Sequence, residues 1–299
     1  MKYPNIKTLY KYRAFRVRNK ESNVIDERLI NSLLKEEIWI SSPDSFNDPF
    51  DCNLRPGELG VNWEERLTEL VSVFVNSPKK LLEVIRNKHP KLKDSPDEQV
   101  LKIIESMFSD DLHAESMHLF RKSLLDELWT KFKDNVESIG VYSLSETQDN
   151  PLLWAHYGDD HKGFCVEYER NEDNLLGNER YTFPVRYSYE YPNISMSDIL
   201  HLDDLENGGN LSAEQTFVGA IMLTKSDHWA YEKEWRIISH GNNMLCDAPG
   251  KITSLIFGLR MPEEDRRYLK DKFGDTVRYK EIVMVEGEFR LKAINIESA

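Results

Sequence analysis

Two strand-rich parts of this chain lie on either side of a long stretch whose apolar residues recur at helical spacing. Trp63 and Leu67 begin one apolar stripe in that stretch, and further stripes with the same period follow as far as residue 134. Such an order of elements does not suit a doubly wound parallel sheet, in which strands and helices alternate regularly. We predict one α+β domain over residues 1–299, with a mixed or antiparallel central sheet and a helical insertion at residues 62–134.

The other elements follow from periodicity and capping signals. Helices are predicted at residues 25–36, at 150–157 with Asn150 as the cap, from Ser212 to about Lys225, and after Pro262. Strands are predicted at residues 6–13, 37–41, 139–144, 163–168, 184–189, 234–238 and 252–257, and in a final hairpin of 277–285 with 288–294. The chain has neither GxGxxG nor GxxxxGK[ST], so neither a Rossmann nor a P-loop nucleotide site is expected.

Composition excludes several classes of protein. The formal net charge is −13, whereas a protein that binds duplex nucleic acid needs a basic surface to displace counterions. The three cysteines, Cys52, Cys165 and Cys246, are far apart and form no CxxC pair, which indicates reduced thiols rather than a disulfide framework or a zinc site. No apolar run approaches the length that spans a bilayer. We therefore expect a cytoplasmic protein with no membrane segment, no bound metal and no duplex partner.

Four short segments concentrate the polar and aromatic side chains from which chemistry is expected. In the first, residues 9–13, strand alternation places Tyr10 and Tyr12 on one face and Lys11 and Arg13 on the other. Tyrosines and a guanidinium together could bind a ligand. The alternative is a half-buried edge strand with a solvated basic face.

The second segment, residues 46–51, carries Asn47, Asp48 and Asp51 between two phenylalanines and a proline. These side chains either bond the backbone of their own turn or project into a cleft that the rings hold rigid. Carboxylate oxygens also bind divalent cations, but two acids alone do not make a full ligand set.

The third segment, residues 154–165, contains His156 and His161, and histidine is suited to general acid–base work near neutral pH. Their spacing of five does not match the helical i, i+4 pair of a metal site. The alternative is that Trp154 and Tyr157 belong to the core and that His156 bonds a backbone carbonyl.

The fourth segment, residues 228–238, would place Glu232, Glu234 and Arg236 on one face if it were extended. A carboxylate beside an arginine is typical of a structural salt bridge. An acid pair at this spacing also suits chemistry at a sugar, because a carboxylate can hold a ribose hydroxyl and stabilise positive charge at the anomeric carbon.

Together these segments resemble a bacterial protein family of unknown function. The resemblance lies in LYKYR at residues 9–13, FNDPFD at 46–51, WAHYGDDHKGFC at 154–165 and YEKEWR at 231–236. It spans most of the chain outside the predicted helical insertion. The motif set is specific to the family but implies no activity.

The chain is also similar, more distantly, to the ADP-ribosyltransferase superfamily, because Glu232-Lys233-Glu234 matches the E-x-E pair of some members. The resemblance implies that NAD is the substrate, that Glu234 is catalytic and holds the ribose, and that Glu232 orients the acceptor. These enzymes also place a polar residue on a first strand and an aromatic or hydroxyl residue on a second.

For the first-strand group, the resemblance implies Tyr10, Tyr12 or Arg13, with a tyrosine stacking on the nicotinamide and the arginine pairing with a phosphate. The second-strand hydroxyl would be Ser41 or Ser42, although their surroundings depart from the stricter S-T-S pattern.

Three hypotheses follow. The first is an ADP-ribosyltransferase-like enzyme that takes a small nucleotide, NAD, and the second is a non-enzymatic binding or sensor module, for example in bacterial defence or stress response. The third is a metal-dependent nuclease or phosphodiesterase that uses Asp48, Asp51, His156 and Glu234. A transferase predicts Glu234 in a cleft with an aromatic wall, a nuclease predicts three converging ligands, and a module predicts acids fully paired with arginines.

Overall fold

The structure is a computed structural model that describes residues 2–18, 23–52, 82, 86, 90–108, 134, 137–190 and 217–296. Most of the predicted insertion at residues 62–134 therefore lies outside the described residues. Within it, helix α4 (Asp97–Phe108) begins where the Ser95-Pro96 pair predicts a helix start.

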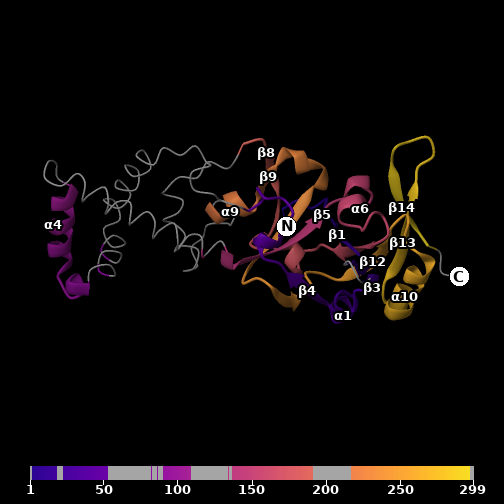
Figure 1. Ribbon diagram of the computed structural model, residues 1–299, viewed down its shortest axis with the longest axis horizontal. Helices are drawn as coiled ribbons and strands as arrows, with labels where there is room; N and C mark the ends of the chain where they lie inside the picture. The colour runs from indigo at the N-terminus through magenta and orange to yellow at the C-terminus, as the bar shows by residue number, and fades with distance from the viewer. Residues whose placement is uncertain are drawn as a thin grey trace.

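An eight-stranded sheet forms the centre of the fold (Figure 1). Every neighbouring pair of its strands is antiparallel except β12 and β13, which are parallel. In order across the sheet, the strands are β14 (Leu291–Asn295), β13 (Arg278–Met284), β12 (Ile252–Phe257), β6 (Phe164–Glu169), β1 (Thr8–Arg13), β5 (Ile139–Ser145), β10 (Glu234–His240) and β7 (Thr182–Pro184). The predicted α+β class and mixed sheet are confirmed.

Three two-stranded sheets flank the centre. They pair β2 (Arg16–Arg18) with β3 (Asn23–Ile25), β4 (Glu37–Ile40) with β11 (Met244–Asp247), and β8 (Arg186–Ser188) with β9 (Thr224–Ser226). The single strand predicted at residues 184–189 is wrong, because the chain changes partner at Val185. The amide of Val185 donates to the carbonyl of Glu234 at 2.8 Å, and that of Arg186 to Leu223 at 2.7 Å.

The remaining elements are helical. The α-helices are α1 (Glu27–Leu34), α4, α6 (Pro151–His156), α9 (Phe217–Met222) and α10 (Glu263–Phe273), and the 3-10 helices are η1 (Pro43–Ser45), η2 (Pro90–Leu92), η3 (Leu175–Gly177), η5 (Asp227–Glu232) and η6 (Gly274–Thr276). The helix predicted to reach Lys225 is wrong at that end, since α9 stops at Met222 and Lys225 lies on β9. Ser212, its predicted cap, lies outside the described residues.

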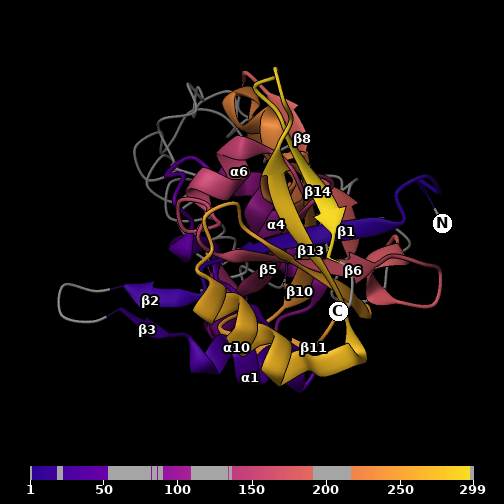
Figure 2. The same cartoon turned by 90° about the vertical axis from the view of Figure 1, so that its right-hand side faces the viewer.

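Alternation along the central strands separates two cores. Leu9 of β1 packs with α1 and α10 on one face of the sheet, whereas Tyr10 and Tyr12 pack on the other face with Leu153 and Trp154 of α6. Figure 2 shows α1 and α10 together on one side of the strands and α6 on the other. None of the helices that the structure describes is long and apolar enough to cross a membrane.

The central sheet opens between β1 and β5. Strand β1 pairs with β6 along its whole length, from Thr8 to Arg13, and β5 pairs with β10 over seven residues. In contrast, β1 and β5 pair only at Tyr10 and Ser145. The two halves of the sheet therefore diverge beyond that point, and side chains from both faces reach the opening.

Helix α6 gives a first stability test. The side chain of Asn150 accepts from the amide of Leu152 at 2.9 Å and donates to the carbonyl of Tyr231 at 2.8 Å, so it caps α6 and ties it to η5. We expect Asn150→Ala to lower the free energy of unfolding in urea by about 1–2 kcal/mol, because both bonds are lost. Asn150→Asp keeps the cap acceptor and should lose less. Equal losses in the two variants would contradict this account of the cap.

Candidate functional site

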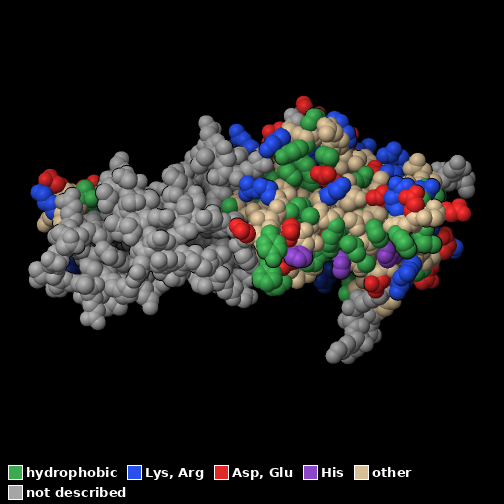
Figure 3. All heavy atoms as spheres, turned by 90° about the horizontal axis from the view of Figure 1, so that it is seen from above, with side chains coloured by type: hydrophobic (Ala, Val, Ile, Leu, Met, Phe, Trp, Pro, Cys, Tyr) green, Lys and Arg blue, Asp and Glu red, His purple; other side chains and the backbone are tan. Residues whose placement is uncertain are grey.

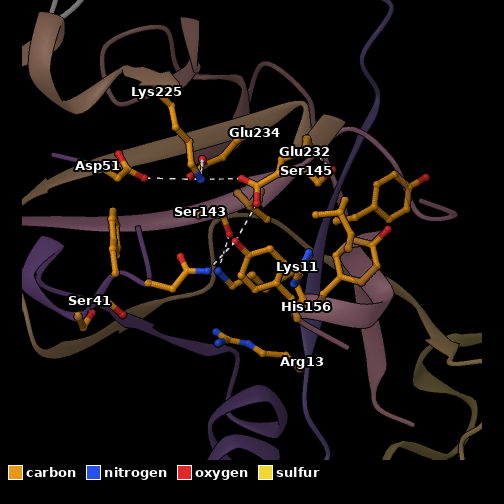
Figure 4. Close-up of a pocket in the computed structure, with 18 of the residues that line it drawn as sticks. Lys11, Arg13, Ser41, Asp51, Ser143, Ser145, His156, Lys225, Glu232 and Glu234 are labelled. Atoms are coloured by element: carbon orange, nitrogen blue, oxygen red, sulfur yellow. Dashed lines mark hydrogen bonds and ion pairs between the residues drawn. The ribbon is translucent and has the colours of Figure 1, made fainter. Parts of the chain in front are cut away.

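A cavity of about 510 Å³ lies at the opening between β1 and β5 (Figure 4). It draws its walls from β1, β5, β10, the loop after β4, helix α6, strand β9 and η5. Its lining residues are Tyr10, Lys11, Tyr12, Arg13, Ala14, Ser41, Ser45, Phe46, Asn47, Asp51, Ser143, Leu144, Ser145, Leu153, His156, Tyr157, Lys225, Glu232 and Glu234. The structure thus brings residues from all four predicted segments to one cavity.

Side chains from both faces of strand β1 line the cavity. The two tyrosines border the cavity but are almost fully buried, and the Tyr12 hydroxyl donates to the carbonyl of Thr147 at 2.7 Å. Burial raises the pKa of Tyr10 to about 12, so its phenol stays protonated. Lys11 and Arg13 lie on the opposite face of the strand, 4.7 and 5.7 Å from the ring of Tyr142. The alternation predicted for this strand is therefore observed.

Strand β5 contributes two hydroxyls, from Ser143 and Ser145, that were not predicted as site residues. Ser143 and Ser145 point to one face of a strand whose other residues are apolar or aromatic. The hydroxyl of Ser145 donates to the carbonyl of Glu232 at 2.6 Å, and that of Ser143 hydrogen-bonds Glu234. The S-x-S spacing inside a buried strand was the available signal, because it places two polar groups on the same face.

The serines proposed for the second strand lie elsewhere. Ser41 lines the cavity and follows β4, which pairs with β11 outside the central sheet, although Ser41 itself forms an isolated bridge to Val141 of β5. Ser42 is buried and caps η1, where its hydroxyl accepts from the amide of Asp44 at 3.4 Å. The strand between β1 and β10 is instead β5, so its hydroxyls are the ones that stand beside Glu234.

The FNDPFD loop divides into residues that face the cavity and residues that hold the turn. Phe46, Asn47 and Asp51 line the cavity. The carboxylate of Asp48 accepts from the amide of Phe50 at 2.9 Å and does not line it. Asp48 is therefore a turn residue, as one of the two interpretations of this segment predicts.

The third segment, residues 154–165, likewise contains some residues that face the cavity and others that do not. His156 and Tyr157, at the end of α6, line the cavity. Trp154 is fully buried, its indole donates to the carbonyl of Gln148 at 2.9 Å, and its ring meets that of Tyr12 edge-on at 5.0 Å. His161 lies outside the lining, in a turn with a positive φ of 70°, and burial lowers its pKa.

The strand predicted at residues 234–238 is confirmed as part of β10, whereas the residues before it are helical rather than extended. Residues Asp227–Glu232 form η5, Lys233 adopts the left-handed conformation with φ of 44°, and β10 begins at Glu234. The turn at Lys233 nevertheless keeps Glu232 and Glu234 close, since both carboxylates meet the ammonium of Lys225. The predicted juxtaposition of the two acids is therefore present, although by a different backbone path.

Lys225 is the centre of a buried ion cluster. Its ammonium lies 2.6 Å from Glu232, 3.0 Å from Glu234 and 3.6 Å from Asp51, and its side chain is 5% exposed. Figure 4 shows these carboxylates converging on the nitrogen from separate elements. Burial alone would lower the pKa of Lys225, but the three carboxylates raise it above its usual value, so the ammonium stays charged.

Arg236 closes the cluster from the core side and does not itself line the cavity. It is 0% exposed, and its guanidinium donates to Glu234 at 2.8 and 3.0 Å and to Asp51 at 2.5 Å. A further bond reaches the carbonyl of Met222 at 2.7 Å. The fork of donors fixes the Glu234 carboxylate from both of its oxygens.

The pKa values of the two glutamates are shifted in opposite directions. Burial, with a smaller contribution from the Glu234 carboxylate, raises the pKa of Glu232 although Lys225 opposes the change. Burial would also raise the pKa of Glu234, but Arg236 and Lys225 outweigh it and lower the pKa to about 2. Glu234 is therefore ionised near neutral pH, whereas Glu232 is the more basic carboxylate of the two, and such divergence is typical of acid–base sites.

Aromatic rings surround the acidic side of the cavity. The hydroxyl of Tyr157 donates to Glu232 at 2.7 Å, and the ring of Phe46 lies 5.5 Å from the guanidinium of Arg236. His156 contacts Trp229 and Tyr231 of η5, at 6.2 and 6.4 Å between ring centroids. The wall next to the acid pair is therefore aromatic.

Within the described ranges, no three histidine, cysteine, aspartate or glutamate side chains are placed to hold a metal ion. On the face seen in Figure 3, basic and acidic side chains of the described part are interspersed and form no continuous basic surface.

Comparison with known proteins finds a family model that matches part of the chain and indicates no activity. Residues 153–237 match a family described as protein of unknown function (DUF2971). The matched region includes the third segment and all but the last residue of the fourth, with Lys225, Glu232, Glu234 and Arg236, whereas LYKYR and FNDPFD precede it. The expected resemblance to a family of unknown function is confirmed. No curated protein and no solved structure matches the chain.

Proposed function

We propose that this cavity binds NAD and cleaves its nicotinamide–ribose bond, with water or a second molecule accepting ADP-ribose. The observation that carries the proposal is the arrangement of three adjacent strands. Arg13 from β1, hydroxyls from β5 and the acid pair before and on β10 line one cavity, in the order of residue types that the resemblance to ADP-ribosyltransferases implies.

The charges suit a step in which positive charge develops on a sugar. As the bond between the anomeric carbon and the pyridinium nitrogen breaks, its electrons pass to nicotinamide and the ribose becomes oxocarbenium-like. Glu234, an anion held by Arg236, would stabilise that charge and accept a bond from a ribose hydroxyl. Glu232, whose pKa is raised, would take the proton of the attacking acceptor.

The other lining groups match the remaining parts of the dinucleotide. Arg13 would pair with a phosphate, since none of its described neighbours is a carboxylate within ion-pair distance and its buried Nε has no hydrogen-bond partner. The nicotinamide ring would lie against Phe46 and Tyr157 rather than Tyr10 or Tyr12, because both of those phenol rings are packed in the core.

Replacing Glu234 by aspartate, whose side chain is shorter, tests the proposal. We expect Glu234→Asp to lower the rate of nicotinamide release by about 10²–10³-fold, because the charge is kept but withdrawn from the ribose. Glu167→Asp is the matched control, since Glu167 is also a buried, ion-paired glutamate of the central sheet, bonded to Lys280 at 2.5 Å outside the cavity. Release that is unaffected by Glu234→Asp, or equally reduced in both variants, would contradict the assignment.

One observation favours a second candidate, a non-enzymatic module that binds a nucleotide. Both glutamates are already engaged in ion pairs, as expected of acids with a structural role. A module of this kind would bind NAD or a related nucleotide without releasing nicotinamide, so the two candidates differ in turnover rather than in binding.

A further inference from the structure

The amine of Lys11 has no role in the proposed cleavage, and its position is unusual. Lys11 lies where β1 and β5 have ceased to pair, one residue beyond the Tyr10–Ser145 contact. Its Nζ donates to the carbonyl of Ser143 at 2.6 Å, which supplies a donor to a backbone acceptor at the edge of the opening. The side chain thus holds its nitrogen in the wall of the cavity.

Lys11 also differs in its partners from Lys225, the buried lysine on the acidic side of the cavity. Lys225 meets three carboxylates, whereas no ion pair joins Lys11 to a carboxylate within the described part of the chain. The nearest charged neighbour on its own strand is Arg13, on the same face and beside the same tyrosine ring. Figure 4 shows Arg13 on the opposite side of the view from Lys225 and Asp51. The cavity therefore has an ion-paired side and a cationic side.

These surroundings disfavour the protonated amine. Burial, followed by the repulsion of Arg13, lowers the pKa of Lys11 to about 7, although Glu234, Glu232 and the buried thiol of Cys165 act in the opposite direction. Near neutral pH a large share of this amine is therefore unprotonated, whereas an ordinary lysine, with a pKa of about 10.4, is almost entirely protonated. Desolvation and a neighbouring cation are the two means by which proteins make a lysine nucleophilic.

We propose that Lys11 is a carbonyl-reactive amine and that the cationic side of the cavity takes small phosphorylated aldehydes or ketones. Its Nζ attacks the carbonyl carbon, the oxygen takes up the proton that the nitrogen loses, and loss of one water leaves an imine. Neither an oxidant nor a reductant is needed. Arg13 holds the phosphate, because its guanidinium is two residues away on the same face of β1. The inference goes beyond NAD cleavage and does not depend on it.

Pyridoxal phosphate is a direct probe, because it carries an aldehyde and a phosphate. The full chain is mixed with an equimolar amount near neutral pH, the imine is reduced with borohydride, and the modified lysines are located by peptide mass spectrometry. We expect the initial rate of labelling at Lys11 to exceed that at exposed lysines by on the order of 10²-fold, from its larger unprotonated fraction. Lys225 should stay unlabelled. Labelling spread over exposed lysines, with Lys11 no faster, would overturn the proposal.

A second comparison tests the phosphate. In the native protein, pyridoxal phosphate should label Lys11 faster than pyridoxal, which lacks the phosphate. The preference at Lys11 should exceed the preference at exposed lysines, which reports the intrinsic reactivity of the two probes, and in Arg13→Gln it should fall to that level even if both rates fall. A preference at Lys11 no larger than that at exposed lysines in the native protein, or an excess that survives Arg13→Gln, would overturn the role of Arg13. Neither assay uses NAD, so their outcomes are independent of nicotinamide release.

Discussion

Replacing Arg236 by methionine is expected to lower the free energy of unfolding by about 3–5 kcal/mol, the loss usual when one partner of a buried ion pair is removed. Methionine fills much of the same volume, but the carboxylates of Glu234 and Asp51 would lose their guanidinium. The carbonyl of Met222 would also lose a donor. Equilibrium unfolding in urea, followed by tryptophan fluorescence, measures the effect.

The matched control is Arg266→Met. Arg266 pairs with Glu281 at 2.7 Å, but both side chains are partly exposed, at 16% and 32%. Water can solvate the remaining carboxylate there, so the loss should be only about 0–1 kcal/mol from the ion pair. If the two variants lost similar amounts of unfolding free energy, the claim that the buried cluster stabilises the fold more than a partly exposed ion pair would be contradicted.

The second large effect is expected for Lys225→Met, and it should depend on pH. At pH 7 the loss of unfolding free energy should again be about 3–5 kcal/mol, because Asp51, Glu232 and Glu234 share the ammonium of Lys225. Lys225 lowers the pKa values of Glu232 and Glu234, so removal of its ammonium should raise them, and the folded variant would bind protons more readily than its unfolded chain. Its stability should therefore rise as the pH falls.

The native protein should behave differently in that range. Because the pKa of Lys225 is raised in the folded state, its contribution is fully present below its unfolded value and declines only at alkaline pH. The difference in unfolding free energy between the two proteins should thus narrow from about pH 8 to about pH 5. Unfolding curves at several pH values measure this, and a difference that stays constant across the range would contradict the shared-ammonium arrangement.

Much of the fold could be predicted because local signals and burial agree along the chain. The alternation of Tyr10 and Tyr12 with Lys11 and Arg13 identified β1, and the Asn150–Pro151 pair identified the start of α6. Each of these signals depends on residues within one element, so the sequence alone carries it.

The site was harder to predict because long-range pairing creates it. Lys225 follows an apolar helical pattern, and nothing near it in the sequence indicates that its ammonium meets Asp51, which lies far earlier in the chain. Ser143 falls within the strand predicted at residues 139–144 and Ser145 falls just beyond it, and only the position of β5 between β1 and β10 gives the two hydroxyls a place in the cavity. The E-x-E pair was found in the sequence, but its ion pairing with Arg236 and Lys225 depends on the fold.

The most direct test of the central claim is the binding of a non-cleavable carbocyclic NAD analogue, measured by isothermal titration calorimetry. Ser45→Trp provides a blocked cavity, because Ser45 is exposed, lines the cavity and lies outside the core. We expect saturable binding to the native protein, and weak or no binding to Ser45→Trp with its unfolding curve unchanged. No binding to the native protein, or equal binding to both proteins, would contradict the claim that NAD occupies the opening between β1 and β5.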